Sequence, residues 1–91
     1  MARLDPYIDL LAAFVERNEL DGPAFETRFL KLFKGDETMF PDEEFFVLDK
    51  LFGDVDAYEP DSDLRGEDNI DDDELRASAV ESLAKLRRLV G

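Results

Sequence analysis

Apolar residues recur at intervals of three and four along most of the chain, and this spacing constrains the fold more than any other feature. It places apolar side chains on one face of an α-helix, and no stretch shows the alternation of a half-buried strand. Pro and Gly interrupt the pattern, so we expect helices at residues 5–18, 23–34, 41–58 and 71–89. Short connections favour antiparallel neighbours. The prediction is an all-α, antiparallel four-helix bundle that forms a single domain over residues 1–91.

Several residues at the segment boundaries are typical of helix ends. Asp5 is predicted as the N-cap of the first helix, with Pro6 in its first turn. Asp71 and Glu74 match a capping box at the start of the fourth. The aromatic side chains at helical spacing, Phe46 among them, are assigned to the core. The residues of the last two helices for which burial is predicted are Phe45, Leu48, Phe52, Leu75, Leu83 and Leu86.

The negative charge of the chain is concentrated in its middle. The net charge is −13, and 17 of the 24 acidic residues lie between residues 36 and 74, where Lys50 and Arg65 are the only cations. A general solubility device would spread acids over every helix. An acidic field repels nucleic acid and anionic lipid, and it attracts basic protein surfaces. A basic surface is usually one that holds nucleic acid, so the sequence indicates a nucleic-acid-binding protein as partner, with neither nucleic acid nor membrane bound directly.

The residue types that are missing argue against catalysis. The chain contains neither Cys nor His, which excludes the usual zinc, iron and copper sites and the commonest acid–base catalyst. We therefore expect no cofactor, no metal and no enzymatic activity. No run of about 18 apolar residues is present, and the first residues lack a secretory-signal pattern, so a cytoplasmic location is expected.

A calcium loop is one alternative interpretation of the acidic stretch. Asp61, Asp63 and Asp72 would fall at ligand positions of an EF-hand loop, with Gly66 at its turn. The cation Arg65, however, occupies a position that requires Asp or Asn, and Asp72 is shorter than the bidentate Glu that normally ends the loop. The sequence does not favour calcium binding.

A carrier protein is a second alternative. Small acidic four-helix carriers attach a prosthetic arm to the Ser of an Asp-Ser-Leu motif that opens their second helix. Here the motif is interrupted, as Asp61-Ser62-Asp63-Leu64, and it lies in a late loop. The match is poorer than that to the calcium loop.

The acids fall into two groups by their position relative to the helices. Acids at the start of a helix, such as Asp71 and Asp72, are favoured by the helix dipole and need no partner to explain them. Asp54 and Asp56 lie near the end of the third helix, where an acid costs a few tenths of a kcal/mol up to about 1 kcal/mol. Glu59, Asp61 and Asp63 continue this group into the loop. These five residues are the candidate partner-binding residues.

The segment Asp56-Ala57-Tyr58-Glu59-Pro60-Asp61-Ser62-Asp63 resembles the end of the third helix in the colicin D immunity family, the bacterial self-protective colicin-like immunity proteins. That family shows an acid, an aromatic residue and Glu-Pro-Asp in this arrangement, followed by a polar loop. An Ile-Asp-Asp helix start then follows, matched here by Ile70-Asp71-Asp72. The run Arg65-Gly66-Glu67-Asp68 is additional in this chain. The likeness is good from about Asp49 to Leu86.

The resemblance implies a toxin inhibitor. In that family an acidic surface covers the basic active site of a toxin's C-terminal ribonuclease domain and stands in for the tRNA backbone. Carried over, Asp56, Glu59 and Asp61 would face the toxin's cations, and Asp63 would match an acid of the same loop. We expect a monomer when free and a 1:1 complex with the cognate toxin. The alternative is an acidic helical adaptor or carrier protein that binds a basic partner.

Overall fold

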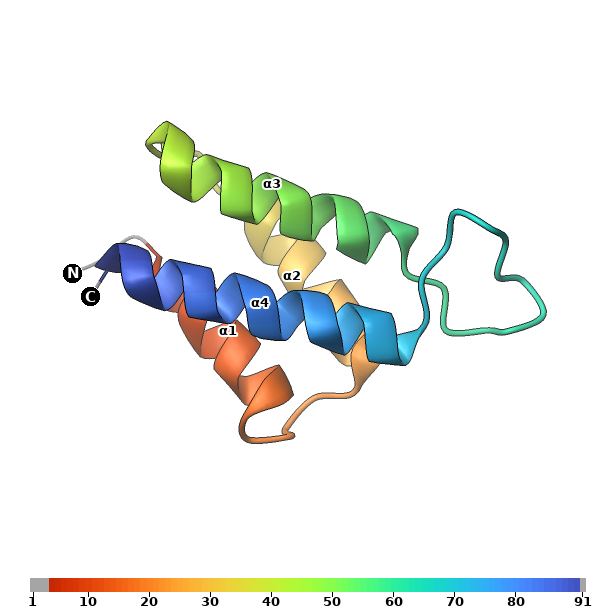
Figure 1. Cartoon of the computed structure of the whole chain (residues 1–91). Coiled ribbons are helices and arrows are strands. Elements are labelled where there is room, and N and C mark those ends of the chain that lie inside the picture. The colour runs from red at the N-terminus through yellow and green to blue at the C-terminus, as the bar shows by residue number, and fades with distance from the viewer. Residues whose placement is uncertain (1–3, 91) are drawn as a thin grey trace.

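Residues 4–90, the part of the chain that the computed structural model describes, form four α-helices (Figure 1). They are α1 (Asp5–Val15), α2 (Gly22–Lys34), α3 (Asp42–Ala57) and α4 (Asp72–Val90). The predicted all-α four-helix bundle is confirmed. Residues 1–3 lie outside the described range. They belong to the N-terminal segment in which the sequence shows no secretory-signal pattern. No helix within residues 4–90 has the length and apolar composition that crossing a membrane requires.

Three helices begin and end within one residue of the predicted bounds, whereas α1 stops three residues early, at Val15. The backbone N–H of Arg17 donates to the carbonyl of Ala12 at 2.9 Å, which closes the last turn. Asn18 then adopts a φ of 51°, in the left-handed region that Asn tolerates better than most residues. A residue in that conformation cannot continue a helix, so the chain turns away from α1 at Asn18.

The start of each helix shows which capping predictions hold. Asp71 accepts a hydrogen bond from the backbone N–H of Glu74 at 2.9 Å, so the predicted cap of α4 is confirmed. Asp21 caps α2 in the same way through the N–H of Ala24, also at 2.9 Å. The prediction for Asp5 is wrong, because the N-cap of α1 is Leu4 and Asp5 is the first helical residue. There its carboxylate still lies where the helix dipole favours it.

The core lies between the apolar faces of all four helices. α4 makes the most extensive contacts, with α1 on one side and α3 on the other (Figure 1). The predicted burial of Leu48, Leu75, Leu83 and Leu86 is confirmed. These side chains meet a row of stacked rings from the first two helices, in which Phe14 and Phe25 lie 4.5 Å apart between centroids. The row continues through Phe29, Phe33 and Phe52.

The predicted burial of the aromatic side chains of α3 is partly wrong. Phe45 is 45% exposed and Phe46 is 72% exposed, whereas Phe52 is half-buried against Phe33, with 5.3 Å between ring centroids. The buried stripe of α3 consists of Leu48, Leu51 and Val55, spaced by three and four residues. The apolar pattern of this helix is wider than the face that the other helices cover, so its remaining aromatic residues lie at the edge of the core or outside it.

Candidate partner-binding surface

The predicted partner-binding acids lie at one end of the bundle, where α3 gives way to the loop that leads to α4. This loop extends away from the helices (Figure 1). Asp56 is on the last turn of α3 and is exposed, and Glu59 follows just beyond the helix and is half-buried. Asp61 and Asp63 are exposed in the loop itself. These four acids are therefore brought together by the chain's exit from a single helix.

Backbone hydrogen bonds close the base of the loop. Tyr58 and Ile70 form an isolated parallel bridge. In it the N–H of Glu59 donates to the carbonyl of Ile70 at 3.1 Å, and the N–H of Ile70 donates to the carbonyl of Ala57 at 3.0 Å. Because both sides of the loop are joined at its base, Glu59 has a defined position relative to α3 and α4.

Two loop side chains, Arg65 and Asn69, hold the loop from inside. The half-buried Arg65 donates from Nε and Nη2 to the carbonyl of Glu59, at 3.1 and 3.0 Å. Asn69 donates from Nδ2 to the carbonyl of Ala57 at 2.9 Å and accepts from the N–H of Gly66 at 2.8 Å. The run that begins at Arg65 distinguishes this chain from the family pattern, and in the structure its first residue stabilises the segment that carries the acids.

The side chain of Tyr58 anchors the loop to α2 and α4. Tyr58 is buried, and its hydroxyl donates to Oδ1 of Asp72 in the first turn of α4. Burial raises the pKa of Tyr58, and the hydrogen bond to Asp72 raises it further, so the phenol stays protonated and remains a donor. Gly22 lies against this pair, since a Cβ there would come within 2.9 Å of the Tyr58 Cζ atom. Only a residue without a side chain fits at the start of α2.

Hydrogen bonds within the loop also orient the acids. Oε2 of Glu59 accepts from the N–H of Asp61 at 3.3 Å. Oδ1 of Asp61 accepts from the N–H of Asp63 at 2.9 Å. Each carboxylate thus receives a local backbone donor from the next member of the series. These hydrogen bonds hold the carboxylates of Glu59 and Asp61 close to the following residues of the loop.

Glu26 of α2 also belongs to this surface, although the sequence did not indicate it. Its pKa is raised by burial first, and then by the negative charges of Glu59 and Asp56. The helix packing brings Glu26 close to acids that are some thirty residues distant in the chain. No local pattern marks such a residue, because its neighbours are set by how α2 packs. We call Glu26, Asp56, Glu59, Asp61 and Asp63 the acidic surface.

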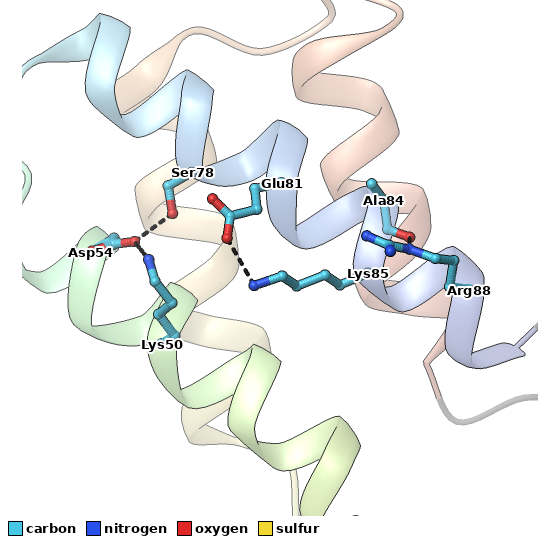
Figure 2. A network of polar contacts seen from close by, with 7 residues as sticks. All are labelled: Lys50, Asp54, Ser78, Glu81, Ala84, Lys85 and Arg88. Atoms are coloured by element: carbon cyan, nitrogen blue, oxygen red, sulfur yellow. Dashed lines mark hydrogen bonds and ion pairs between the residues drawn. The ribbon is translucent and has the colours of Figure 1, made fainter.

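Asp54 is placed differently from the other predicted site residues. Its Oδ2 accepts from Lys50 Nζ at 2.9 Å and from Ser78 Oγ at 2.5 Å, and it thereby joins α3 to α4 (Figure 2). The side chain of Asp54 is only 29% exposed. From the sequence, this acid near the end of α3 was explained by contact with a partner. In the structure, its contacts with Lys50 and Ser78 offset the unfavourable interaction of its charge with the helix dipole.

The acids at the start of α4 have structural contacts of their own. Asp71 caps the helix, and Asp72 accepts from Tyr58. Among residues 4–90, no group of three or more His, Cys, Asp or Glu side chains is arranged to hold a metal ion. What the acidic surface can offer is an array of carboxylate acceptors, which suits the Lys and Arg side chains of a basic protein.

Comparison with known proteins adds one finding. Residues 2–86 match the model of a family described as bacterial self-protective colicin-like immunity. No curated protein and no solved structure matches the chain. The family match covers all four helices as far as Leu86, including the whole loop that carries the acidic surface.

Proposed function

This chain belongs to the bacterial self-protective colicin-like immunity family, and from that premise we propose that it binds and inhibits the basic C-terminal ribonuclease domain of a colicin D-like toxin. Membership places it among protective immunity proteins against colicin-type toxins, a family of inhibitors and not of catalysts. The proposal adds the toxin's ribonuclease domain as the target and the acidic surface as the contact. It also adds a stoichiometry of one immunity chain per toxin domain.

The observation that carries the proposal is the acidic surface at the end of α3. A ribonuclease must present Lys and Arg side chains to phosphate oxygens, and carboxylates are equally good acceptors for those donors. Asp56, Glu59 and Asp61 would occupy the cationic site in place of the RNA backbone, with Asp63 at the edge. The carboxylates contain no bond that the toxin can cut, so the site would be blocked.

The rigidity of the loop supports tight binding. Arg65, Asn69 and Tyr58 hold the loop through side-chain hydrogen bonds before any partner arrives. A preorganised loop loses less conformational entropy on binding than a flexible one. We propose a smaller contribution for Asp54, because its carboxylate is engaged by Lys50 and Ser78.

The dependence of binding on salt tests this proposal. If carboxylates attract the toxin's cations, the association rate constant should fall steeply as ionic strength rises, while the dissociation rate constant changes much less. Stopped-flow mixing of this protein with the cognate ribonuclease domain, sought first in the product of the adjacent gene, measures both. An association rate that stays flat from low to high salt would show that the acidic field plays no part in recognition.

Glu26→Gln should separate binding from folding. We expect the neutral side chain to weaken toxin binding by about tenfold, or about 1.4 kcal/mol, because it removes one negative charge from the acidic surface and replaces one carboxylate oxygen by an NH2 group, which cannot accept from a cation. It should also raise the stability of the free protein slightly at neutral pH, because the pKa of Glu26 is raised in the folded state. This stability gain should be complete above the folded-state pKa of Glu26 and should vanish as the pH falls to its ordinary value of 4.5.

The matched control is Glu37→Gln. Glu37 is an exposed acid in the connection between α2 and α3, and its replacement changes the net charge by the same amount. Binding titrations and urea unfolding at several pH values measure both variants. Equal affinities for the two variants would remove Glu26 from the interface, and a loss of stability in Glu26→Gln would contradict the mutual repulsion of the acids.

A further inference from the structure

α3 exposes aromatic side chains at the end of the helix that lies away from the acidic surface. Phe46 is 72% exposed and Phe45 is 45% exposed, and Met39, just before the helix, is 93% exposed. Scattered apolar residues are normal on a surface, but a large aromatic ring that is mostly exposed beside a hollow is a candidate contact for a partner. Phe46 also lines a hollow of about 310 Å³ between α3 and α4, together with Val47 and Ser82.

This groove between α3 and α4 differs in charge from most of the molecule. Lys50 and Lys85 line it with Glu81, and Lys85 donates to Glu81 at 2.8 Å (Figure 2). A second hollow shares Val47 and Lys85 with the first and adds Glu43, Arg88 and Leu89, so the groove continues along both helices. Its lining carries three cations and two acids. In a chain with a net charge of −13, two copies can approach each other here without strong repulsion.

The exposed residues of α3 are self-complementary in charge about Phe46. Glu43, Phe46 and Lys50 are spaced by three and four residues, so they lie on one face of the helix. Along the chain, the acid Glu43 comes before the ring of Phe46 and the cation Lys50 comes after it. If a second copy of α3 packs antiparallel across Phe46, Glu43 of each copy meets Lys50 of the other, as the symmetry of a two-fold interface requires.

We infer that the free protein pairs with a second copy of itself through the α3–α4 groove, with Phe46 at the two-fold axis. Pairing covers the ring of Phe46 and joins two nearly neutral faces. Asp56 lies about 15 Å further along α3, at 1.5 Å per residue, so the acidic surface stays open on both copies. This proposed dimer differs from the monomer that was expected from the sequence.

Sedimentation equilibrium over protein concentrations from micromolar to millimolar tests the inference. The molar mass should rise with concentration from one chain toward two. Phe46→Glu should weaken self-association by about tenfold or more, because it brings two like charges together at the axis. The matched control is Val80→Glu, since Val80 is a 51% exposed apolar residue of α4 outside the groove lining, and it should associate like the parent.

A charge exchange tests the register of the two helices. Glu43→Lys alone should weaken the dimer, and combining it with Lys50→Glu should restore pairing, because the two charges exchange places across the axis. Circular dichroism of each variant verifies that it is folded. A parent that stays monomeric at millimolar concentration would overturn the inference. So would a dimer that survives Phe46→Glu or that Val80→Glu disrupts equally, because the contact would then lie elsewhere.

The test of self-association can be separated from the test of the proposed inhibition. Phe46→Glu leaves every residue of the acidic surface unchanged, so its affinity for the ribonuclease domain should equal that of the parent. Loss of both self-association and toxin binding in this variant would place the toxin on the α3–α4 groove, which would contradict the proposed contact through the acidic surface and leave the pairing supported. Loss of self-association alone is the expected result.

Discussion

Phe29→Ala is expected to lower the free energy of unfolding by about 3–5 kcal/mol. The ring of Phe29 is fully buried and contacts the rings of Tyr7, Phe25 and Phe33 at centroid distances of 6.1, 6.0 and 5.6 Å. Its removal leaves a cavity that the surrounding rings cannot fill without breaking the row. A domain of this size is stable by about 5–15 kcal/mol, so a large share of the stability would be lost. Urea unfolding followed by circular dichroism measures the change.

Phe46→Ala provides the matched control. The chemical change is the same, but Phe46 is 72% exposed, so truncation should shift the unfolding free energy by no more than about 0.5 kcal/mol. The comparison should be made in dilute protein, where self-association does not contribute. If the two variants unfold at the same urea concentration, the core has been assigned to the wrong face of α2.

Glu59→Ala and Asp61→Ala should each weaken toxin binding by about 2 kcal/mol or more. Each substitution leaves a toxin cation buried without its carboxylate partner, which costs more than the loss of an exposed ion pair. Stability should change little, because within the loop these carboxylates accept single hydrogen bonds from nearby backbone N–H groups, at 3.3 and 2.9 Å. Calorimetric titration with the ribonuclease domain gives the affinities, and urea unfolding gives the stabilities.

Asp71→Ala should behave in the opposite way. Asp71 caps α4 through the N–H of Glu74, so its loss should cost about 0.5–2 kcal/mol of stability and leave the affinity nearly intact. Asp56→Ala should follow Glu59→Ala in weakening binding. If Asp71 proves to be the residue on which binding depends while Glu59 and Asp61 are neutral, the interface lies at the other end of the loop.

The helices could be predicted from the sequence because their signals are local. Spacing places Leu75, Leu83 and Leu86 on one face, and a Pro or Gly marks most boundaries. The position of Phe46 could not be predicted in the same way. Which part of a broad apolar stripe is covered depends on how α3 packs against α4, and periodicity does not contain that information.

The site was predictable only where it is contiguous in the chain. Glu59 and Asp61 are separated only by Pro60, so a charge run and a short motif were enough to make them candidates. Glu26 reaches the same surface from α2, and the Ser78 contact that gives Asp54 a structural role comes from α4. Such contacts join residues that are far apart in sequence, and no local spacing records them.

The contacts that hold the loop in place also depend on the tertiary structure. Arg65 looked like an interruption of an acidic loop, yet its guanidinium donates to the Glu59 carbonyl six residues earlier. Gly22 makes room for the ring of Tyr58, which no feature of the sequence around residue 22 indicates. For both residues the explaining contact is made with a residue that the sequence pattern does not connect to them.

Titrating this protein into a reaction in which the cognate ribonuclease domain cleaves tRNA tests the proposed inhibition most directly. Cleavage should fall linearly and stop at one chain per toxin domain. A variant with both Glu59→Ala and Asp61→Ala should leave cleavage largely intact at that ratio, although it remains folded. Undiminished cleavage with an excess of the parent protein, or full inhibition by the double variant at one chain per toxin domain, would contradict the central claim.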